Sequence, residues 1–172
     1  MAGIPNKIFT IDKGLMNTWA TTYVVASGAA ATIVTGTPTK CVTADGSVAG
    51  AVIPMVDGDG LVTAERFTGL AKTISTDTAS AAGTVDTYVP VPGILYRGYA
   101  KSASAADTQS EINALMGKKV LFDLTTSDWT VDTAATDALV NCVVIQGGIP
   151  ASSEILFVYS PKGTILDTST AI

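Results

Sequence analysis

Three strand-like runs lie end to end between residues 67 and 101, and they constrain the fold of this chain more than any other feature. In each run polar and apolar residues alternate with a period of two, which is the period of a β-strand. The apolar face of the last run consists of Ile94, Tyr96, Gly98 and Ala100. The pattern is weakest in the first run, residues 67–75. Pro90 and Pro92 separate the last two runs, and because proline lacks an N–H donor the chain must turn there.

The rest of the chain has the same sequence pattern, in which short runs rich in β-branched residues alternate with turns of Gly, Pro, Asp and Ser. Two short strands with a hairpin-like return are predicted within residues 19–43. Residues 120–124 and 154–159 alternate as strands, and residues 138–146 form an apolar run suited to the centre of a sheet. With roughly nine or ten short strands about ten residues apart, the sequence predicts an all-β fold. It is an antiparallel β-barrel or sandwich with one short α-helix and an extended N-terminal arm.

The single predicted helix covers residues 109–116. Thr108 and Glu111 form a T-x-x-E capping box at its start, and Gly117 ends it. Its apolar face consists of Ile112, Leu115 and Met116. Lys118 and Lys119 follow, where their charges complement the helix dipole; the alternative is a docking patch for an acidic partner.

The length of the chain, 172 residues, is enough for one domain with an arm and too short for two ordinary domains. We predict an N-terminal arm over residues 1–17 and a single β-rich domain over residues 18–172. The arm carries large apolar side chains that a free monomer exposes at a cost, which favours a partner surface or a strand added to a neighbouring sheet. These predicted contact residues are Ile4, Ile8, Phe9 and Ile11.

Composition limits the kinds of partner. The net charge is −5 and the 10 basic residues are scattered, which argues against direct nucleic-acid binding. Apolar residues make up 47% of the chain but aromatic ones only 6%, so each buried position contributes little area and assembly is expected to add stability. The longest apolar runs are far shorter than the ~20 residues of a spanning helix, so we expect no membrane partner. No secretory signal is visible, which predicts folding in a cytoplasm.

The side chains on which most catalysts depend are scarce. The chain has no His, which removes Ser-His-Asp and Cys-His catalysis and His-ligated zinc. Neither of the common phosphate-binding glycine motifs occurs, and we expect no enzymatic activity and no cofactor. Asp57 and Asp59 lie among glycines and favour a plain β-turn, with a calcium loop as the alternative. Cys41 and Cys142 are predicted to be buried thiols, with a disulfide as the alternative.

The texture of four segments resembles that of one family of phage proteins. The segments are FTGLA at 67–71, VPVPGI at 89–94, YRG at 96–98 and VLFDL at 120–124. Together with the acidic, Ala- and Thr-rich loops between residues 48 and 166, they make the chain similar to tailed-bacteriophage capsid decoration (cement) proteins. The resemblance implies a virion protein at the capsid surface, assembled in the host cytoplasm. Such proteins bind the outside of an expanded capsid, often as a homotrimer, and stabilise it by bridging major capsid protein subunits.

On this resemblance, Ile4, Ile8, Phe9 and Ile11 contact the capsid or a neighbouring subunit. Two other functions remain open. One is a phage tail-tube or head–tail connector subunit, which self-assembles without a capsid. The other is a small carbohydrate-binding β-module in which Trp19 or Trp129 stacks on a sugar, although tryptophans of this kind more often lie in a core or an interface.

Overall fold

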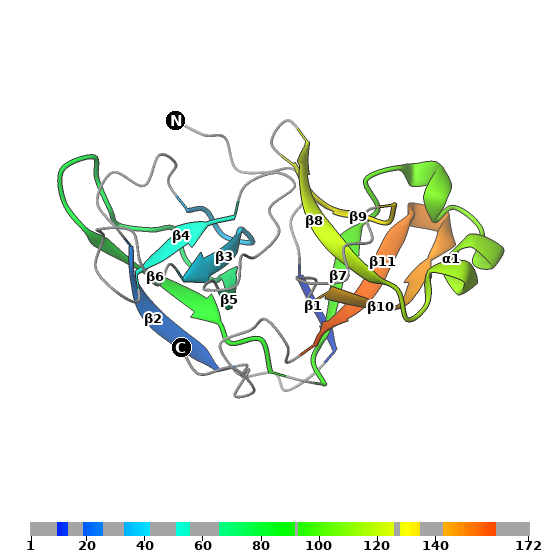
Figure 1. The fold of residues 1–172 in the computed structure, drawn as a ribbon, viewed down its shortest axis with the longest axis horizontal. Coiled ribbons are helices and arrows are strands. Elements are labelled where there is room, and N and C mark those ends of the chain that lie inside the picture. Colours follow the sequence, from blue (N-terminus) through cyan, green and yellow to red (C-terminus); the bar gives the residue numbers. More distant parts are fainter. Residues whose placement is uncertain are drawn as a thin grey trace.

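The computed structural model describes residues 10–13, 19–25, 33–41, 51–55, 66–91, 93–125, 128–134 and 143–160, with only the backbone of residues 10–13 and Thr125. Within these residues, eleven β-strands and one α-helix form two units that share a core (Figure 1). The predicted all-β class with a single short helix is confirmed.

The first unit is a closed barrel of five short strands in the order β2-β4-β3-β5-β6. The strands are β2 (Ala20–Val25), β3 (Pro38–Cys41), β4 (Val52–Pro54), β5 (Arg66–Ala71) and β6 (Gly83–Tyr88). Neighbouring strands are antiparallel except β2 and β4, which pair in parallel at Val25 and Val52. Small and β-branched side chains fill the interior, as a narrow barrel requires. They are Val25, Ile33, Val52, Ala71 and Val85.

The second unit is a six-stranded antiparallel sheet in the order β1-β7-β11-β10-β8-β9. Its strands are β1 (Thr10–Lys13), β7 (Leu95–Tyr99), β8 (Lys119–Thr125), β9 (Asp128–Asp132), β10 (Val143–Ile149) and β11 (Glu154–Tyr159). Two 3₁₀ turns, Ala103–Ala105 and Pro150–Ser152, and the helix α1 (Gln109–Leu115) complete it.

The helix α1 packs against β10. The contact is close at Gly148, where a Cβ atom would lie 2.7 Å from Cδ1 of Ile112. The sheet itself curls until its last strand meets the chain just after β7. There Ala100 forms a parallel bridge with Val131, and the N–H of Lys101 donates to the carbonyl of Val131 at 2.9 Å. This single contact makes the second unit a nearly closed barrel.

Both units follow the same path. In chain order the strands are β2 to β6 in the first unit and β7 to β11 in the second. Each circuit leads from the first strand of its unit to the fifth, then to the fourth, the second and the third. Each circuit then returns to its first strand through a parallel contact. Strand β1 lies outside this circuit, against β7.

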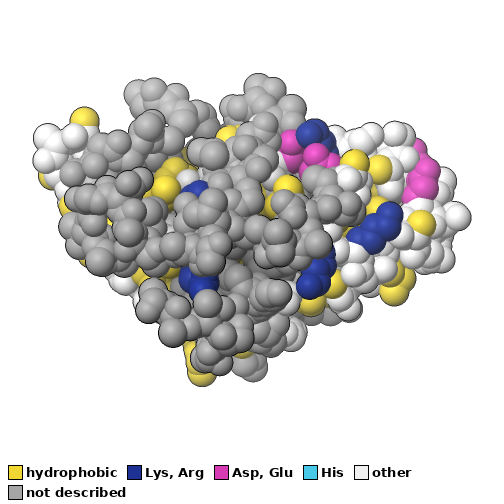
Figure 2. Space-filling model, in the orientation of Figure 1, with side chains coloured by type: hydrophobic (Ala, Val, Ile, Leu, Met, Phe, Trp, Pro, Cys, Tyr) yellow, Lys and Arg dark blue, Asp and Glu magenta, His cyan; other side chains and the backbone are white. Residues whose placement is uncertain are grey.

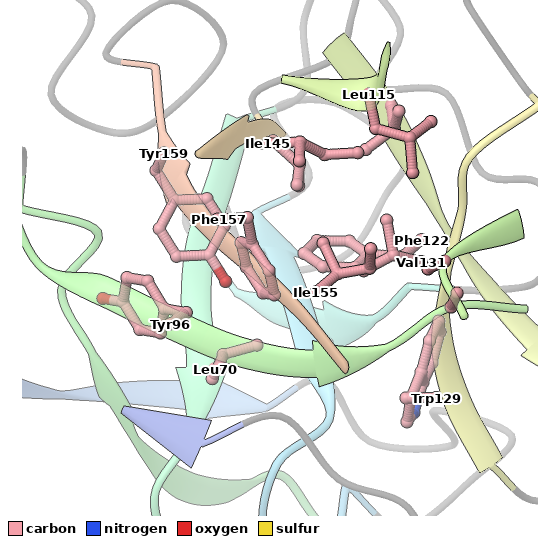
Figure 3. Packing of buried hydrophobic residues seen from close by; sticks show 14 of the residues in the cluster. Leu70, Tyr96, Leu115, Phe122, Trp129, Val131, Ile145, Ile155, Phe157 and Tyr159 are labelled. Atoms are coloured by element: carbon pink, nitrogen blue, oxygen red, sulfur yellow. The ribbon is translucent and has the colours of Figure 1, made fainter. Parts of the chain in front are cut away.

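Aromatic side chains join the two units. Phe67 of β5 is fully buried, and its ring centroid lies 4.6 Å from that of Tyr159 and 5.8 Å from that of Phe122. Figure 3 shows Tyr96, Phe122, Phe157 and Tyr159 gathered beside Leu70 of β5. Because Phe67 and Leu70 belong to the first unit and the other rings to the second, one core stabilises both.

Two sequence predictions are corrected by the structure, and the run with the weakest pattern is confirmed as a strand. The strands within residues 19–43 form no hairpin, because β4 lies between β2 and β3. The weakly patterned run at 67–75 contains β5, all six residues of which are buried, because the strand has the barrel interior on one face and the shared core on the other. Met116 does not join the apolar face of α1: it is 55% exposed, whereas Ile112 and Leu115 are buried.

Candidate functional surfaces

Of the four predicted contact residues, the structure describes only Ile11. It lies in β1, opposite Tyr96 of β7, so its backbone belongs to the edge of the chain's own sheet. Ile4, Ile8 and Phe9 lie outside the described residues. Contact of these four residues with a capsid or a neighbour stays a prediction, as does the division into an arm and a domain.

Strand β2 is exposed along most of its length. The side chains of Ala20, Thr21 and Thr22 are exposed, Val24 is 42% exposed, and Trp19 immediately before the strand is 70% exposed. The strand contains no charged residue and no proline, the features by which natural edge strands avoid pairing with other chains. Residues 19–24, here named the β2 surface, therefore suit apolar and main-chain contacts.

The two tryptophans differ in environment. Trp129 of β9 is 3% exposed and belongs to the shared core, so the interpretation as a core residue is confirmed for it. Trp19 is not a core residue; it immediately precedes β2 and its carbonyl accepts a hydrogen bond from the N–H of Val89, and its role in an interface stays a prediction. An indole of this exposure is typical of contact surfaces.

An ionic cluster holds the second unit closed. The Nζ atom of Lys101 lies 2.7 Å from Oδ1 of Asp123 in β8 and 3.0 Å from Oδ2 of Asp132 in β9. Asp123 is 4% exposed, and the hydroxyl of Thr130 donates to its second oxygen at 3.3 Å. Hydrogen bonds to Asp123 and then Asp132 raise the pKa of Lys101 above its ordinary value, so the ammonium form persists. The cluster is a structural clamp, because one ammonium bridges the carboxylates of two neighbouring strands.

Sequence patterns gave no sign of this cluster, because Lys101, Asp123 and Asp132 meet only through the curl of the sheet. Another ion pair, between Arg97 of β7 and Glu154 of β11, joins neighbouring strands at 3.3 Å. Figure 2 shows the described basic side chains of the visible face as separate spots, one of them beside acidic groups. On this face the described basic side chains form no continuous track.

The helix cap contains two carboxyl groups that share a hydrogen bond, Asp107 and Glu111. The predicted capping box is confirmed: the hydroxyl of Thr108 accepts from the N–H of Glu111, and the Glu111 carboxylate accepts from the N–H of Thr108 at 3.0 Å. Hydrogen bonds from Thr108 and then from Asp107 lower the pKa of Glu111, whereas the hydrogen bond and charge of Glu111 raise the pKa of Asp107. Lys118 and Lys119 are exposed beyond the helix, and their role as a docking patch stays a prediction.

Three further sequence predictions concern metals and thiols. No group of three or more Cys, Asp or Glu side chains arranged to hold a metal ion occurs in the described ranges. Asp57, Asp59 and Cys142 lie outside those ranges. Cys41 is half-buried and packs against the barrel core together with Tyr23, whose pKa is raised by burial first and by the nearby thiol second.

In the part of the chain that the structure describes, no helix is long and apolar enough to cross a membrane.

The fold and these surfaces define the class of the protein: an all-β chain of two joined five-stranded circuits, with a strand that carries no charged residue exposed. No family model matches the sequence, and comparisons with curated proteins and with solved structures also gave no match.

Proposed function

We propose that this chain is a structural protein of a tailed-phage virion, which binds the outer surface of the capsid and stabilises it by bridging major capsid protein subunits. The observation that carries the proposal is the set of exposed side chains on the β2 surface, which offers the indole of Trp19 and uncharged neighbours for adhesion. Surface of this kind is uncommon on a freely soluble monomer and is typical of proteins that work in contact with others.

The two-unit architecture supports the bridging part of the proposal. A chain with two barrels of the same path can meet two neighbouring subunits of a shell while its shared core keeps the barrels together. Modest contacts are then sufficient, because attachment at one site raises the effective concentration at the next. Association as a homotrimer belongs to the same proposal, and three chains would present six barrels to the lattice.

The test is sedimentation of the purified chain, alone and with expanded empty shells assembled from the phage's major capsid protein. We expect the chain to sediment with the shells and to raise the temperature at which they break apart. Replacement Trp19→Ala should weaken binding about tenfold or more, as truncation of an interfacial tryptophan commonly does. The control Ser80→Ala changes an exposed residue of the same unit and should leave binding unchanged.

Two results would count against the proposal. If the chain stays in the supernatant at saturating shell concentrations, it is not a decoration protein. If it forms rings or tubes by itself, the tail-tube or connector function is favoured instead. Equal binding by the Trp19→Ala variant would remove the β2 surface from the contact.

A further inference from the structure

The two units correspond residue by residue around their circuits. In the first unit Cys41 pairs with Val52, which pairs with Val25; in the second Phe122 pairs with Val131, which pairs with Ala100. The remaining registers agree as well, since Leu70 opposite Tyr88 matches Val144 opposite Val158. The two circuits therefore have one architecture with matched interior positions.

Loop hydrogen bonds show the same correspondence. Gly36, at φ 84°, donates to the carbonyl of Ala71 at 2.8 Å, and Gly117, at φ 79°, donates to the carbonyl of Ile145 at 2.8 Å. The return bonds match too: Ala71 donates to Thr37 at 2.9 Å, and Ile145 donates to Lys118 at 3.0 Å. Positive φ at both glycines explains why neither carries a side chain. The two halves of the chain thus repeat one path with matched backbone contacts.

The correspondence locates an edge of β2 that no described strand covers. Aligning Val25 with Ala100 places Ala20 and Thr22 at the positions of Leu95 and Arg97. Leu95–Arg97 pair with β1, whereas the described residues place no strand beside Ala20–Thr22. The carbonyl of Trp19 accepts a hydrogen bond from Val89, so the backbone groups of Trp19 point toward the β6 side of β2. Because the backbone groups of successive strand residues point to opposite edges, the N–H and C=O groups of Ala20 and Thr22 point to the other edge, away from β6.

We infer that this edge of β2 docks the C-terminal segment of the same chain, residues 164–167, in the way that the edge of β7 docks β1. The segment reads Thr-Ile-Leu-Asp, similar to the Thr-Ile-Asp of β1, and begins with two β-branched residues, which favour a strand. Its pairing satisfies two N–H and two C=O groups of β2 that otherwise depend on water.

The length of chain beyond β11 suits this occupant. The strand ends at Tyr159, which lies in the shared core, and Tyr88, the partner of Ala20, packs against the same core. From Ser160, four steps at roughly 3.5 Å each bring the chain to Thr164 with a reach of about 14 Å. Figure 1 shows the end of β11 and the start of β2 on the same side of the molecule.

The first test is amide hydrogen exchange resolved by residue in the full chain and in a variant lacking residues 161–172. We expect the deletion to speed exchange about tenfold or more at Ala20 and Thr22, but not at Thr21 and Tyr23, whose N–H groups face β6. Unchanged amides in β7 and β11 show that the truncated chain is folded. A synthetic peptide of residues 161–172 should restore slow exchange. Equal exchange at Ala20 and Thr22 with and without the segment would overturn the inference.

The second test is a disulfide between Thr21→Cys and Ile165→Cys. The β1–β7 register, in which Ile11 is opposite Tyr96, places Ile165 opposite Thr21. Such a non-hydrogen-bonded pair has a Cα separation of about 4.5 Å, within disulfide range. Oxidation should give a cross-linked monomer, with the bond located by peptide mass spectrometry. The control pair Thr21→Cys and Ser169→Cys should react much more slowly. Equal rates, or cross-linked dimers, would contradict an occupant from the same chain.

Discussion

Gly69 and Gly117 both have positive φ, at 128° and 79°, but their surroundings differ. A Cβ atom on Gly69 would collide with the carbonyl of Tyr88, whereas one on Gly117 would meet open space. Gly117→Ala should therefore cost only the backbone strain of about 1–2 kcal/mol, and Gly69→Ala should cost clearly more. Urea unfolding of both variants checks this, and equal midpoints would contradict it.

Lys101 is expected to stabilise the fold by neutralising the buried Asp123 carboxylate rather than by the packing of its own side chain. Lys101→Met leaves a carboxylate of 4% exposure without its cation, so the variant should unfold at lower urea concentration. Adding Asp123→Asn should recover part of the loss, because the uncompensated charge is removed. Lys118→Met serves as the control, since that side chain is exposed and should change little. Failure of the second substitution to rescue would mean that the charge is not the cause.

The sequence predicted the burial of some individual side chains and not of others. Alternation correctly placed Ile94, Tyr96 and Ala100 on a buried face. It did not distinguish buried Trp129 from exposed Trp19, because residue type alone does not say where a strand enters the barrel. The Lys101 cluster was also beyond prediction, since its members meet only after three strands have paired.

The start of α1 should give the protein an acid-sensitive element. Because the pKa of Glu111 is lowered in the folded state, its contribution is fully present above its ordinary pKa. The contribution is lost as pH falls through the lowered value. In an Asp107→Asn background, which removes the coupled carboxyl, Glu111→Gln should thus be destabilising at neutral pH and nearly neutral in strong acid. Unfolding midpoints over a pH series measure this, and a pH-independent difference would contradict it.

The contribution of the Thr108 cap to stability can be measured separately. Thr108→Ala removes the hydroxyl that accepts from Glu111 and should cost about 1 kcal/mol at neutral pH. The control is Ser110→Ala, which changes an exposed residue in the first turn of α1 and should leave the stability nearly unchanged. A larger loss in the control would mean that general helix propensity, not capping, decides the result.

The positions of helices and strands were predicted better than the pairing of the strands. The helix, β8, β11 and the three strands between residues 66 and 99 lie close to the predicted positions, because periodicity and capping are local signals. The predicted hairpin before residue 43 failed, since no local pattern announces that β4 inserts between β2 and β3. The full burial of β5 was missed for the same reason: its second face is covered by the other unit.

For the whole molecule, Phe67 is the side chain expected to keep the two units unfolding together. Phe67→Ala should cost about 3–5 kcal/mol and separate the transitions, because its ring contacts Phe122 and Tyr159 across the junction. Phe157→Ala is the matched control, equally buried but with ring contacts inside the second unit. Far-UV dichroism and Trp129 fluorescence should coincide on urea unfolding in the parent and control, and diverge only for Phe67→Ala.

The repeated chain path also bears on how the chain avoids errors as it folds. Two stretches of one polypeptide that build the same circuit compete for each other's partners, a hazard typical of tandem proteins. Here matched positions differ in bulk: Thr39 and Cys41 in one half are equivalent to Val120 and Phe122 in the other. A strand inserted into the wrong half would leave voids or clash with its neighbours. Divergence between the halves thus protects the nascent molecule from shuffling its own strands.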